Sequence, residues 1–289
     1  GSVVLAATGV VGQSSDGLDQ RTNGNGTPLG DIASRVRTNY GLDRECDRAF
    51  TLSPKCRTGD RPEILVWGDS YAMQLVQGLL ASEPDVQLIQ MTKTACGPIF
   101  DVAPVFTKEY NVKWAEGCLA FNSEVRQWLT TNRTVRFAVL SSPFWQYMED
   151  GQLLIDGRLQ DASMDVAAEY MHRTLNALKG IGITPVVFSP TPQDGNNIGQ
   201  CLVKAEFFGV DVTACNFSLA SVTERSKAVY AWLARIAETQ DVVFLSDGMC
   251  RAGQCSASMD GTFLYRDKGH LSQEGSAFLG KRIGFYGLV

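Results

Sequence analysis

The feature that most constrains the fold is a fivefold alternation of short apolar segments with segments of helical spacing, which starts at Ile64. Strands that alternate with helices in this way form a parallel sheet with helices on both faces. The sequence therefore predicts an α/β fold, a three-layer α/β/α sandwich around a five-stranded parallel sheet. Strands are expected at 64–67, 86–91, 136–142, 183–190 and 241–246. Helices are expected from Ala72 onward and over 109–130, 163–180, 221–239 and 273–285.

The first 61 residues lack this alternation. Residues 12–30 are rich in Gly, Ser, Asn and Asp, which is typical of a loop or linker. Residues 31–60 are polar, with one possible short helix. We therefore expect residues 1–61 to form an extension and residues 62–289 to form the folded domain.

Charge and hydropathy exclude two classes of protein. The net charge is -5, from 26 basic and 31 acidic side chains, which argues against a nucleic-acid-binding surface. No apolar run reaches the roughly 18 residues of a membrane-spanning helix. A hydrophobic content of 44% is ordinary for a globular domain.

The eight cysteines lie in four close pairs along the chain. Local pairing is the simplest arrangement, although eight cysteines allow 105 pairings. The alternatives are reduced thiols or a zinc site, but no C-x-x-C spacing occurs and the chain has only two histidines. We expect no metal site, and we expect four disulfides formed in an oxidising compartment. The pairs are Cys46–Cys56, Cys96–Cys118, Cys201–Cys215 and Cys250–Cys255.

A serine stands where the first strand meets the first helix, in the stretch WGDSYA. Gly68 adopts backbone conformations that other residues avoid, so it suits a sharp turn at this point. One interpretation is that Ser70 caps the helix, since serine and aspartate both cap well. The other is that Ser70 is a nucleophile at the carboxyl end of a strand, where open α/β sheets bind their ligands.

A serine nucleophile needs a base, and the chain offers only His172 and His270. His172 lies within a predicted helix, where a surface or packing role is the ordinary interpretation. His270 lies in a loop after the fifth strand, and Asp267 precedes it by three residues. This spacing allows the carboxylate to accept from one ring nitrogen while the other faces a serine.

Two short stretches resemble sequence blocks of the SGNH/GDSL hydrolase family: Gly68-Asp69-Ser70 matches the first block, and Asp267-Lys268-Gly269-His270 matches the last. The resemblance covers about residues 62–289. The resemblance implies Ser70 as nucleophile, His270 as general base and acid, and Asp267 as the residue that orients His270. The family's oxyanion hole uses a glycine after the second strand and an asparagine after the third. Here Gly97 matches the glycine, but SSPFWQY contains no asparagine, and Ser142 or Trp145 stands in its place. We therefore expect oxyanion donors from Ser70, Gly97 and Ser142.

WGDSYA, the CGP loop, SSPFWQY and DKGHLSQEG also resemble the SGNH domains fused to acyltransferase-3 membrane proteins, which O-acetylate bacterial surface glycans such as lipopolysaccharide O-antigen. GLDQR at 17–21 resembles the segment that follows their last membrane helix. The resemblance implies a periplasmic domain of an inner-membrane protein, with the membrane domain as partner in the same chain. It also implies a glycan acceptor, acetyl-CoA as ultimate donor through the membrane domain, and no cofactor bound by this domain.

Three aromatic residues follow the third strand, and we expect some of them to line the acceptor groove: Phe144, Trp145 and Tyr147. The ordinary alternative for Trp145 is packing at the sheet edge. Three functions remain open from the sequence: a carbohydrate O-acetyltransferase domain, a free-standing esterase or deacetylase with the same triad, and a glycan-binding module with a vestigial site.

Overall fold

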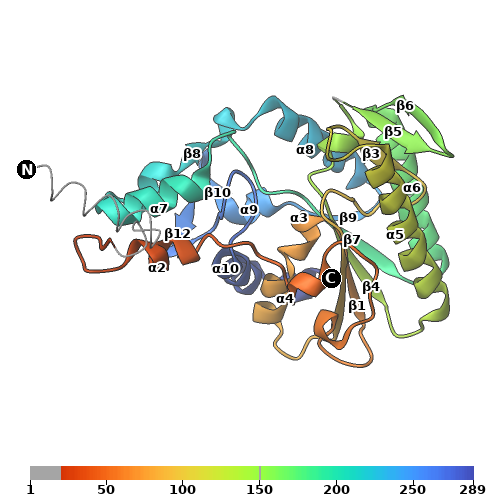
Figure 1. Cartoon of the computed structure of the whole chain (residues 1–289), viewed down its shortest axis with the longest axis horizontal. Coiled ribbons are helices and arrows are strands. Elements are labelled where there is room, and N and C mark those ends of the chain that lie inside the picture. Colours follow the sequence, from red (N-terminus) through yellow and green to blue (C-terminus); the bar gives the residue numbers. More distant parts are fainter. Residues whose placement is uncertain (1–20, 150) are drawn as a thin grey trace, which may run out of the picture.

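A computed structural model describes residues 21–149 and 151–289. Its central sheet has five strands in the order β2-β1-β4-β7-β9, and all neighbouring strands are parallel. The sheet and its flanking helices confirm the predicted α/β sandwich (Figure 1). The strands are β1 (Ile64–Gly68), β2 (Leu88–Thr92), β4 (Phe137–Ser141), β7 (Thr184–Phe188) and β9 (Asp241–Val243).

Alternate residues of β1 point to opposite faces of the sheet and so enter two separate cores. Leu65 and Trp67 belong to the core covered by α5 (Val112–Thr131), α6 (Met164–Gly180) and α8 (Glu224–Ile236). Ile64 and Val66 belong to the core on the opposite face. The helices that contribute to this second core include α3 (Ser70–Met73), α4 (Val76–Ser82) and α10 (Gln273–Ile283).

The register of the sheet brings the strand ends to one edge. Gly68, the last residue of β1, pairs with Thr92 at the end of β2 and with Ser141 at the end of β4. Ser141 in turn pairs with Phe188 at the end of β7. The loops after these four strands therefore open side by side at the carboxyl edge, where sheets of this type carry their sites.

Several elements were not predicted because they are short or lack a clear period. A three-stranded antiparallel sheet is formed by β3 (Ala103–Val105), β5 (Gln152–Ile155) and β6 (Arg158–Asp161). Two further helices are α7 (Ile198–Phe208) and α9 (Leu245–Met249), while α2 (Leu29–Ser34) overlaps the start of the range in which one possible short helix was expected. The remaining short strands are β8 (Phe217–Ser218), β10 (Cys250–Arg251), β11 (Gln254–Cys255), β12 (Ser258–Met259) and β13 (Thr262–Phe263). Single 3₁₀ turns cover Arg44–Cys46, Pro54–Cys56, Trp145–Tyr147, Val212–Cys215, Leu219–Ser221 and Phe285–Leu288.

The helix expected from Ala72 onward is divided into α3 and α4. The Ser276 hydroxyl accepts a hydrogen bond from the Gly78 N–H at 3.0 Å and donates to the carbonyl oxygen of Gln74. A regular helix would pair these two backbone groups with each other, so the inserted hydroxyl breaks the ladder.

The strand expected at 241–246 is also shorter than predicted. It ends at Val243, and α9 begins at Leu245, whose N–H donates to Ser189 Oγ at 3.0 Å.

The described part of the N-terminal extension packs against the domain. Ile32 is 1% exposed within the second core. The Thr58 N–H donates to the carbonyl oxygen of Leu88 at 2.9 Å, and Arg57 forms a bridge with Ile89 of β2. The boundary at residue 61 stays a prediction. Most of the GLDQR segment lies outside the described residues.

Four disulfides join the cysteines in the predicted pairs. The Cys96–Cys118 disulfide ties the loop after β2 to α5. Among the residues that the structure describes, no helix is both long and apolar enough to cross a bilayer.

Candidate active site

Ser70 is the first residue of α3 and follows the turn at Gly68. The φ angle of Gly68 is 146°, and a Cβ at this position would lie 2.2 Å from the carbonyl oxygen of Ser141. The turn therefore requires glycine. Asp69 caps the helix by accepting from the Tyr71 N–H at 2.9 Å. Because Asp69 is the cap, the Ser70 hydroxyl is available for another role.

The structure brings Ser70, His270 and Asp267 together in a chain of hydrogen bonds. Ser70 Oγ lies 2.8 Å from His270 Nε2. His270 Nδ1 lies 2.9 Å from Asp267 Oδ2 and 3.1 Å from Oδ1. An Nδ1–H that donates to the carboxylate leaves Nε2 free to accept the serine proton. The arrangement therefore suits nucleophilic catalysis by Ser70.

The Asp267 carboxylate is stabilised as an anion. Partial burial raises its pKa, but hydrogen bonds from the His270 ring and from the backbone N–H groups of Gly269 and His270 outweigh that effect. The net pKa of Asp267 is well below its ordinary value. The carboxylate is thus charged at neutral pH and can stabilise an imidazolium at His270.

Two residues that sequence reasoning missed hold the histidine in place. The Tyr71 ring lies 4.5 Å from the His270 ring, centroid to centroid. Gln193, in the loop after β7, donates from Nε2 to Tyr71 Oη at 2.8 Å. A Cβ at Gly269 would lie 2.4 Å from the Gln193 amide, so a larger residue there would displace this side chain. Gln193 carried no signal in the sequence, because its contacts come from distant loops.

Among the described residues, one of the three predicted oxyanion donors is free to bind a ligand and two already donate hydrogen bonds within the protein. The Ser70 N–H donates no hydrogen bond within the described part of the chain, so that amide is available. The Gly97 N–H is not free, because it donates to Tyr147 Oη at 2.9 Å. Ser142 is fully buried and its Oγ donates to Asp69 Oδ2 at 2.7 Å. The expectation that Gly97 and Ser142 present free donors is therefore corrected for this structure.

Ser142 belongs to a buried polar network centred on Asp69. Besides the bond from Ser142, Asp69 Oδ2 accepts from Gln146 Nε2 at 3.4 Å. Gln146 Oε1 is buried and has no partner within the described residues. Burial raises the pKa of Asp69 to about 7, against the opposing effect of these donors. The network ties the nucleophile turn to the loop after β4.

Only one of the three aromatic residues in SSPFWQY lines a groove. Phe144 and Tyr147 are both 0% exposed, so the expectation that they meet a ligand is corrected. Trp145 is half-buried and lines a groove of about 520 Å³ that also contains Gln193 and Lys268. This Trp145 groove therefore adjoins the loop that carries Asp267 and His270. The Arg225 guanidinium lies 4.1 Å from the Trp145 ring centroid and covers one of its faces.

In the described ranges, 21–149 and 151–289, there is no cluster of three or more His, Cys, Asp or Glu side chains that suits a metal ion.

Comparisons with known proteins identify the family and the fold of the chain. A family model described as "SGNH domain (fused to AT3 domains)" matches residues 43–284. A comparison with curated proteins finds no match. Among solved structures, the periplasmic domain of a lipopolysaccharide acetyltransferase from Salmonella ser. Paratyphi A is 16% identical, with a TM-score of 0.66. The match covers 90% of this chain and 97% of that one, and at this identity it shows a shared fold.

Two further structures resemble the chain more distantly. A carbohydrate acetylesterase from Sinorhizobium meliloti is 15% identical, with 78% of this chain and 97% of that chain covered and a TM-score of 0.43. The C-terminal catalytic domain of peptidoglycan O-acetyltransferase A from Streptococcus pneumoniae is 12% identical, with 80% and 93% covered and a TM-score of 0.32.

Proposed function

The chain belongs to the family of SGNH domains that are fused to AT3 domains, and on that premise we propose that it is the acetyl-transferring domain of a carbohydrate O-acetyltransferase. The observation that carries the proposal is the hydrogen-bonded chain Ser70–His270–Asp267 at the carboxyl edge of the sheet. A serine hydroxyl is weak at neutral pH and becomes a nucleophile when a positioned base accepts its proton.

In the first half of the proposed reaction, Ser70 Oγ attacks the carbonyl carbon of a donor acetyl group while its proton passes to His270 Nε2. The tetrahedral intermediate collapses, the bond to the donor breaks, and the donor group leaves with the proton from His270. The product is an acetyl ester on Ser70. Asp267 stabilises the imidazolium that forms in between.

In the second half, His270 takes the proton of a sugar hydroxyl as its oxygen attacks the acetyl-serine carbonyl. The ester bond to Ser70 then breaks, the serine oxygen recovers a proton from His270, and the acetylated sugar is released. Transferase and hydrolase differ only in whether a sugar hydroxyl or water makes this second attack. The Trp145 groove is where we place the sugar, because it lies against the loop that carries Asp267 and His270.

For the donor and the acceptor we keep the assignments that the family resemblance implies. An AT3 membrane domain in the same chain would deliver acetyl from cytoplasmic acetyl-CoA to the periplasmic side. The acceptor would be a bacterial surface glycan, with lipopolysaccharide O-antigen as the specific proposal. The four disulfides support an oxidising compartment such as the periplasm.

The test is acetylation of surface glycan by the full-length protein and its variants. Ser70→Ala and His270→Ala are expected to abolish acetylation, and Asp267→Asn is expected to reduce it severely, since loss of the equivalent carboxylate elsewhere costs about 10⁴ in rate. His172→Ala is the matched control, because it removes the chain's other histidine from α6, and we expect normal acetylation.

Intact-mass analysis of the quenched protein should show one acetyl group on Ser70. Normal acetylation by Ser70→Ala protein at wild-type abundance would refute catalysis by this triad and favour a glycan-binding module. Rapid ester hydrolysis that added glycan does not divert would favour the esterase alternative.

A further inference from the structure

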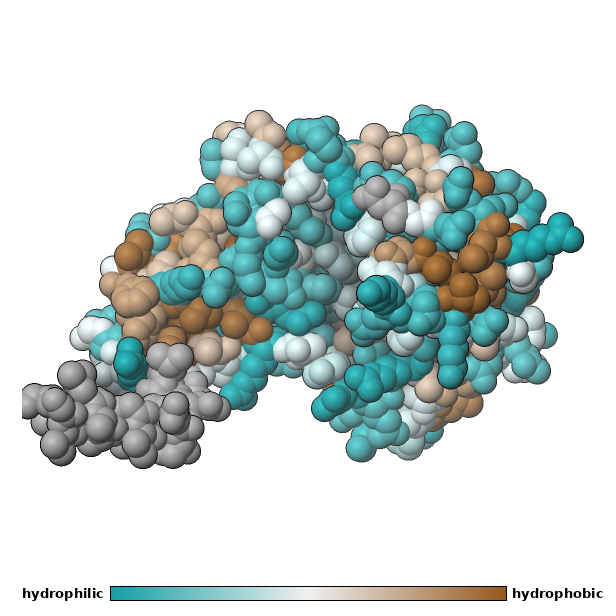
Figure 2. All heavy atoms as spheres, turned by 45° about the horizontal axis from the view of Figure 1, so that its top comes forward, coloured by the Kyte–Doolittle hydropathy of each residue, from teal (hydrophilic) through white to brown (hydrophobic). Residues whose placement is uncertain are grey.

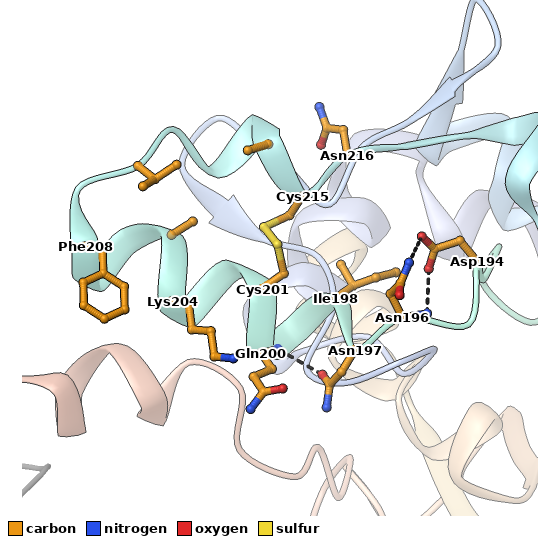
Figure 3. Close-up of a pocket in the computed structure, with 13 residues that line it drawn as sticks. Asp194, Asn196, Asn197, Ile198, Gln200, Cys201, Lys204, Phe208, Cys215 and Asn216 are labelled. Atoms are coloured by element: carbon orange, nitrogen blue, oxygen red, sulfur yellow. Dashed lines mark hydrogen bonds between the residues drawn. A yellow bond between two sulfur atoms is a disulfide. The ribbon is translucent and has the colours of Figure 1, made fainter.

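A second groove, separate from the Trp145 groove, runs along one face of α7 and has a volume of about 580 Å³. Figure 3 shows Phe208 at one end of the helix, Asp194 and Asn196 beyond the other end, and the Cys201–Cys215 disulfide between them. We call this the α7 groove. Its lining includes the N-cap residue Asn197 and six residues of α7: Ile198, Gln200, Cys201, Lys204, Ala205 and Phe208. Eleven helical residues make this face about 16 Å long.

The α7 groove begins beside the proposed catalytic loop. The Gly199 N–H donates to the carbonyl oxygen of Asp267 at 3.2 Å, and a Cβ at Gly199 would lie 2.1 Å from the carbonyl oxygen of Arg266. The helix start is therefore packed directly against the loop that supplies Asp267 and His270.

The loop over 193–197 separates the two grooves. Gln193 and Gly195 line the Trp145 groove, whereas Asp194 and Asn196 line the α7 groove. An elongated ligand that enters the Trp145 groove and crosses this short loop would reach the α7 groove without leaving the surface.

The chemistry of the α7 groove suits hydroxyl-rich, uncharged ligands. Its lining contains amide side chains, which both donate and accept hydrogen bonds as hydroxyl groups do. The only charged lining residues are Asp194 and Lys204, which have opposite signs. Phe208 is 72% exposed and offers an apolar ring at the far end. Figure 2 likewise shows apolar surface bordered by hydrophilic side chains on the left-hand part of the molecule, which carries α7.

Two of the amides are held in a fixed orientation. Asn197 Oδ1 accepts from the Gln200 N–H at 3.0 Å, and Asn216 Oδ1 accepts from the Ala257 N–H at 2.8 Å. No acceptor for either Nδ2 group lies among the residues that the structure describes. Each amide therefore presents a pre-oriented donor, which reduces the entropy lost on binding.

We propose that the α7 groove binds neutral sugar units of the acceptor glycan that flank the unit held in the Trp145 groove. The inference rests on the proposed function for the identity of the ligand, and it makes the acceptor a polymer rather than a single sugar. Three observations support the proposal: the two grooves share the loop over 193–197, amide side chains line the α7 groove, and the Phe208 ring is exposed.

The test measures glycan binding without turnover. The probe is de-O-acetylated O-antigen polysaccharide from the bacterium that encodes the chain, titrated calorimetrically into Ser70→Ala protein. On this background Gln200→Ala and Phe208→Ala are each expected to weaken binding about tenfold, a loss of about 1.4 kcal/mol. Both side chains are exposed, so the fold should persist. The matched controls are Gln127→Ala on α5 and Leu159→Ala on β6, which remove an exposed amide and an exposed apolar side chain outside the groove.

A monosaccharide from the same polysaccharide should bind all of these variants equally, because it fills the Trp145 groove alone. Equal polysaccharide binding by groove variants and controls would overturn the proposal. So would a Phe208→Ala defect that appears only in the full-length membrane protein, because that result would make the groove a protein contact. Groove-dependent polysaccharide binding without any acetyl-serine would keep this inference and refute the proposed transferase.

Discussion

The hydrogen bond from the Gly97 N–H to Tyr147 Oη leads to a prediction about catalytic rate. Both groups are buried, and their separation is 2.9 Å. If the Gly97 N–H is an oxyanion donor, Tyr147 competes with the tetrahedral intermediate for it. One oxyanion donor is worth about 10²–10³ in rate in a well-studied protease. Tyr147→Phe removes the competing oxygen, and we expect hydrolysis of p-nitrophenyl acetate to rise at least about tenfold.

The same substitution should lower stability. A buried N–H left without a partner costs about 1–3 kcal/mol, and this loss is measurable by urea denaturation. Tyr265→Phe is the matched control, because Tyr265 is also 0% exposed and its hydroxyl donates to the carbonyl oxygen of Pro192 at 2.8 Å. The control should lose similar stability without a gain in hydrolysis. Unchanged or slower hydrolysis by folded Tyr147→Phe protein would refute the competition and indicate that the hydroxyl itself supports the reaction.

Two further predictions concern Asp69 and Trp145. Burial raises the pKa of Asp69 from 3.8 to about 7. The folded state therefore holds the Asp69 proton more tightly than the unfolded state does, and the resulting contribution to the free energy of unfolding is complete below about pH 4 and is lost as the pH rises toward 7. Asp69→Asn should therefore become more stable relative to wild type by up to about 4 kcal/mol between pH 4 and pH 7 in urea denaturation, and a constant difference would contradict the raised pKa. Trp145→Ala should reduce acetyl transfer to glycan about tenfold, because it removes an apolar contact to the sugar worth about 1.4 kcal/mol. Hydrolysis of p-nitrophenyl acetate, which does not use this contact, should be unchanged. Trp128→Ala on α5, another half-buried tryptophan, should change neither activity, and equal effects of the two substitutions would place Trp145 outside the acceptor groove.

The sheet and the meeting of Ser70 with His270 were predictable because each depends on local patterns. The period of apolar residues distinguishes strands from helices, and a parallel sheet brings all strand ends to one edge. Ser70 and His270 lie 200 residues apart. Ser70 directly follows β1, whereas α9 and four short strands separate β9 from His270, so the two sequence motifs, rather than the sheet topology alone, predicted that these residues meet. The disulfides were predictable for a similar reason, since each pair is close in sequence.

Contacts between loops were not predictable in the same way. The Ser276 hydroxyl interrupts the backbone hydrogen bond between Gly78 and Gln74 because of the way α10 packs on α4. The residues near Gln74 contain no glycine or proline pattern that would predict the end of a helix there. The α7 groove depends on a helix of eleven residues that begins in a segment rich in glycine and asparagine. Gln193 acquires its role only because Tyr71 and Gly269 approach it from distant loops.

The segment SSPFWQY shows why three neighbouring aromatic residues could not be assigned from the sequence. Phe144 has a φ angle of 59°, in the left-handed region that a bulky residue rarely adopts and that costs on the order of 1–3 kcal/mol. The turn that follows directs Trp145 to the groove, while Tyr147 is buried with its hydroxyl on the Gly97 N–H. A regular backbone would not separate these two side chains in this way. The strained turn at Phe144 therefore has a consequence for the site, because it places the Trp145 ring in the groove where we propose that the sugar binds and the Tyr147 hydroxyl on the Gly97 N–H.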